Sequence, residues 1–331
     1  MRATINNACA VILRAYIFPT LLLPVLVWTS PLPQQGYGEY VPRLTVTVEE
    51  VEARRVQLNE LLFGQPGLPA TLPADGAVPL PNGLSSILSG LAPDEPNGAA
   101  IIYHAGHDGM NDVDLYAVRR FAQAGYITIV LQMPLVGPNE PPTLDIPHVG
   151  QVTLTEHAHL EQLDSITEGS PLRYFIEPVI SLVNELTARG YERIYMVGLS
   201  GGGWTTTVAA AIDPRITASY PVAGSVPLGA RWTSRDLRTS DWEQVAPELY
   251  SIANYTDLYL MGAYQRRQIQ VLNARDNCCF SDPRHEIWEE AVSTALGDAG
   301  EFRVLWDTTA TFHAITPWAV DQILVDMARD A

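Results

Sequence analysis

Residues 193–204 read Arg-Ile-Tyr-Met-Val-Gly-Leu-Ser-Gly-Gly-Gly-Trp, and they are the part of the chain that indicates its fold most clearly. The run 194–197 is short, apolar and partly β-branched, which predicts one buried strand. The small residues of 205–212 predict a helix soon after it. Ser200 lies between the two, so we expect its side chain at a sharp turn where a strand passes into a helix.

The turn has the pattern Gly-x-Ser-x-Gly over residues 198–202. Glycine at both ends lets neighbouring backbone pass close by without a steric clash. Such a turn lifts the serine hydroxyl clear of the sheet edge and points the free N–H groups of the helix start toward whatever the serine attacks. The alternative interpretation is a tight turn in which Ser200 only caps the helix.

With its flanking strand and helix, this pentapeptide resembles the nucleophile elbow of the α/β-hydrolases, and the resemblance extends from about residue 97 to the end of the chain. It implies an α/β fold with a mostly parallel central sheet and helices on both faces. The order strand, helix, strand over residues 99–132 agrees, because a βαβ unit builds a parallel sheet. Further strands are expected at 218–223, 268–273 and 302–306, and further helices at 172–189 and 316–328.

The sequence predicts three successive parts. Residues 1–30 contain an apolar run of about 14 residues behind two arginines, which is typical of an export signal, with a retained N-terminal anchor as the alternative. Residues 31–98 are rich in proline and glycine around one predicted helix and form an N-terminal extension that packs on the core. Residues 99–331 form the catalytic domain, with lid-like inserts at 134–170 and 225–265.

Composition limits the classes of function. The net charge of −17 repels nucleic acid and anionic membranes, so we expect neither as a partner, apart from a possible N-terminal membrane anchor. Beyond the predicted signal the cysteines are the adjacent pair Cys278 and Cys279, which form either a vicinal disulfide or two buried thiols. A disulfide is typical of an oxidising compartment. The export signal and the cysteine pair together predict a secreted or periplasmic location.

A serine hydroxyl becomes a good nucleophile only when a base accepts its proton and a third group orients that base. The α/β-hydrolase resemblance implies the order serine, acid, histidine, each in a loop after a strand. His313 follows the last predicted strand, where the family has its base; an ordinary surface-loop histidine is the alternative. As the acid we favour Asp276, which follows the strand at 268–273, over Asp282 and the more distant choice Asp307.

Two backbone N–H donors are needed to stabilise the oxyanion of an acyl-transfer reaction. Gly201, next after the nucleophile, is expected to provide the first. The second is expected from the loop 104–109, whose sequence His-Ala-Gly-His-Asp-Gly departs from the family's His-Gly-x pattern. One alignment selects His107 as the donor, which we favour, and another selects Ala105 or Gly106. The alternative is that both histidines only line a polar loop.

No metal and no cofactor is predicted. His157 and His159 have H-x-H spacing, but no third ligand lies nearby in the sequence, which favours a solvated loop. The aspartates in 108–114 do not match the EF-hand pattern for calcium. The glycines at 201–203 lack the framework of a phosphate-binding loop.

These observations predict a serine hydrolase that cleaves carboxylic esters through an acyl-enzyme on Ser200, because the resemblance most often implies that reaction. The segments 99–109 and 198–204 resemble bacterial esterases of the acetyl-esterase and dienelactone-hydrolase kind. No long apolar run outside the signal indicates a lipid-binding lid, so we expect short acyl chains on a small or polymer-borne ester. The alternatives are a peptidase or amidase with the same triad and a non-catalytic binding protein of the same fold.

Overall fold

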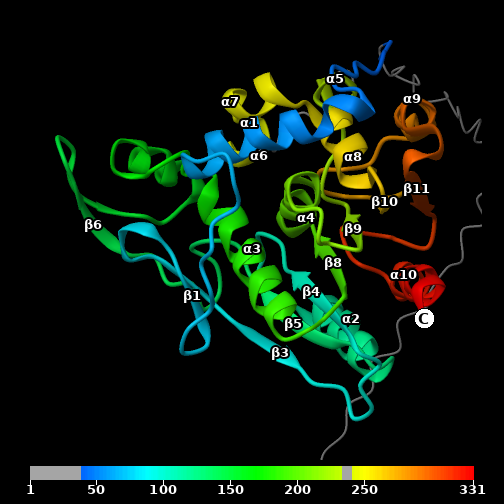
Figure 1. Cartoon of the computed structure of the whole chain (residues 1–331), viewed down its shortest axis with the longest axis horizontal. Helices are drawn as coiled ribbons and strands as arrows, with labels where there is room; N and C mark the ends of the chain where they lie inside the picture. The colour runs from blue at the N-terminus through cyan, green and yellow to red at the C-terminus, as the bar shows by residue number, and fades with distance from the viewer. Residues whose placement is uncertain (1–38, 233–240) are drawn as a thin grey trace, which may run out of the picture. The chain divides into compact units, whose positions relative to one another are not determined.

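The computed structural model describes residues 39–232 and 241–331 of the chain. Its centre is a seven-stranded sheet in the order β11-β10-β9-β8-β4-β5-β3 (Figure 1). Neighbouring strands are parallel except for β3, which runs antiparallel to β5. The strands are β3 (Ser89–Leu91), β4 (Ala99–His104), β5 (Ile127–Leu131), β8 (Arg193–Leu199), β9 (Ala218–Val222), β10 (Arg267–Asn273) and β11 (Glu301–Asp307). The predicted mostly parallel α/β sheet is confirmed.

Helices cover both faces of this sheet (Figure 1). Strands that are buried on both faces read as continuous apolar runs, and every residue of β4 is buried, which fits this rule. Helices α2 (Asp112–Gln123) and α10 (Pro317–Met327) pack on one face. The other face is covered by α3 (Arg173–Ala188), α4 (Gly201–Ile212), α8 (Tyr255–Ala263) and α9 (His285–Leu296).

The N-terminal extension is part of the same compact body in the described range. The helix predicted there consists of η1 (Val48–Glu50) and α1 (Val51–Phe63), which ends at Gly64 in the left-handed conformation with φ 70°. Helix α1 packs on α4, and the buried guanidinium of Arg55 donates to the carbonyl of Ala211 at 3.0 Å.

The extension also supplies β3, the antiparallel edge strand of the main sheet, which the sequence analysis did not predict. Gly90 permits this pairing, because a Cβ atom there would lie 2.3 Å from the carbonyl oxygen of Thr128. The remaining elements of the extension are β1 (Ala77–Pro79), η2 (Pro81–Gly83) and β2 (Ser85–Ile87).

The two segments expected as inserts contain regular elements. Segment 134–170 holds the hairpin of β6 (Thr143–Ile146) and β7 (Gly150–Thr153), followed by the 3₁₀ helix η3 (His157–Ile166). Segment 225–265 holds α5 (Leu228–Trp232), α6 (Trp242–Val245), α7 (Pro247–Ile252) and α8. Helix α8 is buried along its whole length and packs on α4, so it is the core helix between β9 and β10.

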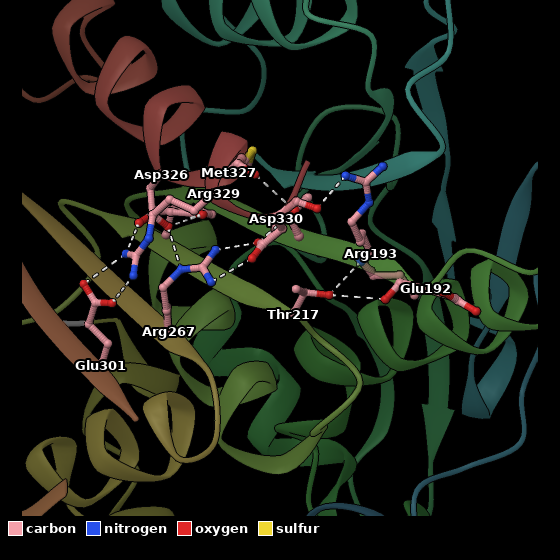
Figure 2. A network of polar contacts seen from close by, with 12 residues as sticks. Glu192, Arg193, Thr217, Arg267, Glu301, Asp326, Met327, Arg329 and Asp330 are labelled. Atoms are coloured by element: carbon pink, nitrogen blue, oxygen red, sulfur yellow. Dashed lines mark hydrogen bonds and ion pairs between the residues drawn. The ribbon is translucent and has the colours of Figure 1, made fainter. Parts of the chain in front are cut away.

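The C-terminus is fixed at the amino ends of the strands by a network of ion pairs (Figure 2). Arg267, the first residue of β10, binds Asp326 at 3.0 Å and Asp330 at 2.5 Å. Arg193, the first residue of β8, donates to the carbonyl of Asp330 at 2.9 Å. This network holds α10 and η5 (Ala328–Asp330) in place and leaves the opposite, carboxyl edge of the sheet to the loops that carry the candidate site.

The predicted export signal, residues 1–30, lies outside the described residues. Within residues 39–232 and 241–331, no helix combines the length and the apolar character that crossing a membrane requires. The remaining described 3₁₀ helix, η4 (Gly297–Ala299), connects α9 to β11.

Candidate active site

Ser200 lies at a strained turn between β8 and α4. Its backbone has φ 58° and ψ −124°, a combination that residues other than glycine rarely adopt. The N–H of Ser200 donates to the carbonyl of Val222 at 2.9 Å, which fixes the turn to the next strand. The backbone around Ser200 is packed too closely for a side chain at the neighbouring glycines. A Cβ atom on Gly202 would lie 2.0 Å from the carbonyl oxygen of His104. The surrounding structure therefore determines the strained conformation of the serine.

The predicted site residues follow different strands, all of which end at the same edge of the sheet. Ser200 follows β8, the loop 104–109 follows β4, Asp276 follows β10 and His313 follows β11. These strands are parallel, so their carboxyl ends meet at one edge, which is where ligands bind in open α/β sheets.

Asp276 and His313 are in direct contact. Nδ1 of His313 lies 2.7 Å from Oδ2 of Asp276, and the side chain of the aspartate is fully buried. Burial opposes ionisation of this carboxyl. The hydrogen bond and charge of His313, together with the N–H groups of Cys278 and Cys279, outweigh burial and lower the pKa of Asp276. Nε2 of His313 is buried and has no hydrogen-bond partner among the described residues, so it is available to a hydroxyl proton.

The loop that carries His313 is held by two asparagines that the sequence analysis did not single out. The side chain of Asn273, the last residue of β10, donates to the carbonyls of Phe312 at 3.2 Å and Ala314 at 2.9 Å. The backbone N–H of His313 itself donates to Oδ1 of Asn277 at 2.9 Å. These bonds fix the backbone on both sides of the imidazole.

The two other acids considered from the sequence have different partners. Asp282 accepts hydrogen bonds from the backbone and the guanidinium of Arg284, which binds it at 2.5 Å. Asp307 is fully buried and accepts bonds from the backbone N–H of Thr309 at 2.8 Å and from the hydroxyl of Thr316. Asp282 therefore stabilises the start of α9, and Asp307 shapes the loop that leads to His313.

The loop 104–109 lies directly against the serine. A Cβ atom on Gly106 would lie 2.6 Å from Cβ of Ser200, so only glycine fits there. The N–H of Ala105 donates to the carbonyl of Leu131 at 3.0 Å, which removes Ala105 from the possible oxyanion donors. The N–H groups of Gly106 and His107 donate to no acceptor in the described part of the chain, so both remain possible oxyanion donors. Gly201 is the first residue of α4 and has no intrahelical acceptor for its N–H.

Cys278 and Cys279 form a disulfide between adjacent residues. Their backbone N–H groups donate to Oδ1 of Asp276 at 2.7 Å and 3.0 Å. The disulfide therefore belongs to the turn that holds the carboxylate in contact with the imidazole.

Comparison with solved structures identifies the fold. Acetyl xylan esterase 1 from a Thermoanaerobacterium species matches with a TM-score of 0.53 and 14% identity, over 85% of this chain and 93% of that one. An acetyl xylan esterase from a Paenibacillus species matches with a TM-score of 0.50 and 16% identity, over 90% and 99%. Est1E from Butyrivibrio proteoclasticus, solved with ferulic acid bound, matches with a TM-score of 0.50 and 13% identity, over 75% and 95%.

No protein-family model and no curated protein sequence matches the chain. At the identities of the structural matches, the likeness establishes the fold, and function has to be argued from the site. The resemblance to the α/β-hydrolases that the pentapeptide indicated is thus confirmed at the level of fold.

Proposed function

We propose that this chain is a serine hydrolase that cleaves carboxylic esters through an acyl-enzyme on Ser200. The observation that carries the proposal is the combination of a strained serine turn with a buried carboxylate–imidazole pair at the same edge of the sheet. A turn in which the serine only caps the helix would not need this strain, and the Ser200 side chain makes no capping hydrogen bond to α4.

In the proposed reaction, Nε2 of His313 takes the hydroxyl proton while Oγ of Ser200 attacks the acyl carbon. The negative charge on the carbonyl oxygen is stabilised by the N–H groups of Gly201 and His107. The imidazolium then gives its proton to the leaving alcohol, and an acyl-enzyme remains. A water molecule then attacks the acyl-enzyme, with His313 acting as base and then as acid, and the carboxylic acid is released. Asp276 holds the Nδ1 proton throughout and stabilises the positive imidazolium.

The proposed substrate carries a short acyl group, either on a small molecule or on a polymer. Two of the matched structures are described as acetyl xylan esterases, which supports this choice. The backbone of Gly106 and the methyl end of Met133 crowd the elbow at Ser200 and Gly201, which limits the room on that side. A secreted or periplasmic location is proposed as well, and the Cys278–Cys279 disulfide supports it.

The test is a set of steady-state assays on the full chain. Esters of one alcohol with acyl chains from acetyl to palmitoyl give the length profile, and an amide of the preferred acyl group separates an esterase from an amidase. We expect the highest kcat/KM for acetyl or a similarly short ester and much slower cleavage of the amide. Faster turnover of palmitoyl than of acetyl esters contradicts the short-chain proposal. Faster cleavage of the amide favours the amidase alternative.

A further inference from the structure

Four potential metal ligands meet beside the elbow, outside the proposed triad. His107 comes from the loop after β4, His157 from the start of η3, and Asp241 and Glu243 from the start of α6. Nε2 of His107 lies 2.9 Å from Oε1 of Glu243 and 3.2 Å from Oδ2 of Asp241. Nδ1 of His157 lies 3.3 Å from both oxygens of Glu243. We call these four residues the His–carboxylate cluster.

The centre of this cluster is a fully buried carboxylate. Glu243 is 0% exposed, and its Oε2 accepts no hydrogen bond within the described residues. A buried carboxylate oxygen without a partner is stable only where a proton donor or a cation reaches it.

The orientation of His157 makes its Nδ1 a possible ligand for a cation. Nε2 of His157 lies 2.9 Å from the carbonyl oxygen of Pro134, and because a carbonyl oxygen only accepts, Nε2 carries a proton. In a neutral imidazole Nδ1 then presents its lone pair to the carboxylate of Glu243. Two electron-rich atoms are held at 3.3 Å only by a proton or a cation between them. A ring nitrogen bonded to a backbone carbonyl, with the other free to ligate, is typical of metal-binding histidines.

The spacing of the donor atoms fits a small tetrahedral ion. Zn²⁺ binds imidazole nitrogen and carboxylate oxygen at about 2.0–2.2 Å, which places neighbouring ligands of a tetrahedral site about 3.3–3.5 Å apart. The nitrogens of His107 and His157 lie 2.9–3.3 Å from the carboxylate oxygens that they face, and one donor atom each from His107, His157 and Asp241 lies within 4.8 Å of the other two, so the donors are close enough to converge on one ion. Two imidazoles favour zinc over magnesium or calcium, which prefer all-oxygen sites.

We propose that His107, His157, Asp241 and Glu243 bind one Zn²⁺ ion. The ion would join the loop 104–109 to η3 and α6. The ring of His107 packs directly on Gly201. A Cβ atom added to Gly201 would lie 2.4 Å from Cε1 of His107. The site is structural: it fixes the loop that lies against Ser200 and takes no part in acyl transfer. The metal-free alternative is a network in which imidazolium ions alone neutralise Glu243.

Calorimetry on the chelator-treated full chain tests the proposal directly. We expect one zinc ion per chain, a higher Tm with zinc than without it, and the visible absorption of tetrahedral Co²⁺ when cobalt replaces zinc. Asp241→Asn is the key variant, because that side chain is half exposed and its change leaves the core intact. We expect it to weaken zinc binding by about 100-fold or more, since loss of a residue that only supports a ligand already costs 10–100-fold.

His159→Asn is the matched control, since His159 lies two residues from His157 in the H-x-H pair but binds Glu156 at the surface. It should bind zinc as the unchanged chain does. Absence of stoichiometric zinc uptake, or equal uptake by Asp241→Asn, overturns the proposal in favour of the metal-free network. No substrate is present in these measurements, so their outcome is independent of the proposed esterase activity.

Discussion

Nδ1 of His313 lies 2.7 Å from Oδ2 of Asp276, although 37 residues separate the two in the chain. The other carboxylate oxygen is occupied by the backbone N–H groups of Cys278 and Cys279. One oxygen of Asp276 is therefore fixed to its own turn and the other to the imidazole. This arrangement keeps the proton on Nδ1 and leaves the lone pair of Nε2 for the hydroxyl proton that His313 accepts in the proposed reaction.

Asp276→Asn should lower kcat by about 10⁴-fold with little change in KM, because the amide favours the wrong tautomer of His313. Steady-state kinetics on the preferred ester measure this. Asp282→Asn is the control: it removes a buried partner of Arg284 and should lower Tm while leaving kcat near that of the unchanged protein. An equal loss of kcat in both variants would show that Asp276 has no special role.

Gly106→Ala should nearly abolish activity, because the new methyl group would lie 2.6 Å from Cβ of Ser200 and 2.9 Å from the carbonyl oxygen of Leu199. The overlap has to be relieved by moving the loop or the elbow, at about 1–3 kcal/mol. We expect lower kcat and lower Tm together. Gly67→Ala, where a Cβ atom meets nothing within 4 Å, should change neither. A fully active Gly106→Ala protein would contradict the close packing at the elbow.

His104 should make stability depend on pH between about 4 and 6.5. Burial lowers its pKa from 6.5 to about 4. In this range the unfolded chain binds a proton at His104 and the folded chain does not, so the free energy of unfolding falls as pH falls, by up to about 3 kcal/mol. Denaturant unfolding at several pH values measures this dependence.

His104→Gln should flatten this part of the stability profile, since glutamine does not titrate. His148→Asn, at an exposed histidine, should leave the profile unchanged. If the His104→Gln protein and the unchanged protein lose the same free energy between pH 6.5 and pH 4, the buried neutral state of His104 is wrong.

Replacing Cys278 and Cys279 together by serine should lower kcat by about two- to tenfold, because the turn that donates to Asp276 becomes less well ordered. Reduction of the unchanged protein should have the same effect, and a reductant should leave the double variant unaffected. Activity assays with and without reductant measure both. If a reductant slows the double variant as strongly as the unchanged protein, the effect of the reductant does not come from the Cys278–Cys279 disulfide.

The elements around the elbow were predictable because their signals are local. Neighbouring residues alone indicate three elements: the strand before Ser200, the small-residue helix after it and the strand that precedes the loop at 104–109. The α/β class and the mostly parallel sheet followed from the same runs. The favoured acid was chosen by its distance from a predicted strand, and in the structure Asp276 contacts His313.

The remaining features depend on contacts between distant residues and gave no local signal. The edge strand β3 has only three residues in a segment rich in proline and glycine, so no periodicity indicated it. The asparagines at 273 and 277 act through backbone atoms of the His313 loop. The contact between His107 and Glu243 spans 136 residues, which is why the H-x-H pair alone did not indicate the His–carboxylate cluster.

The most direct test is to treat the folded full chain with a fluorophosphonate probe and locate the label by peptide mass spectrometry. We expect stoichiometric labelling at Ser200, loss of labelling and of ester hydrolysis in Ser200→Ala, and strongly slowed labelling in His313→Ala. A folded protein that takes no label, or a Ser200→Ala protein that still hydrolyses esters at the original rate, would contradict the proposed mechanism.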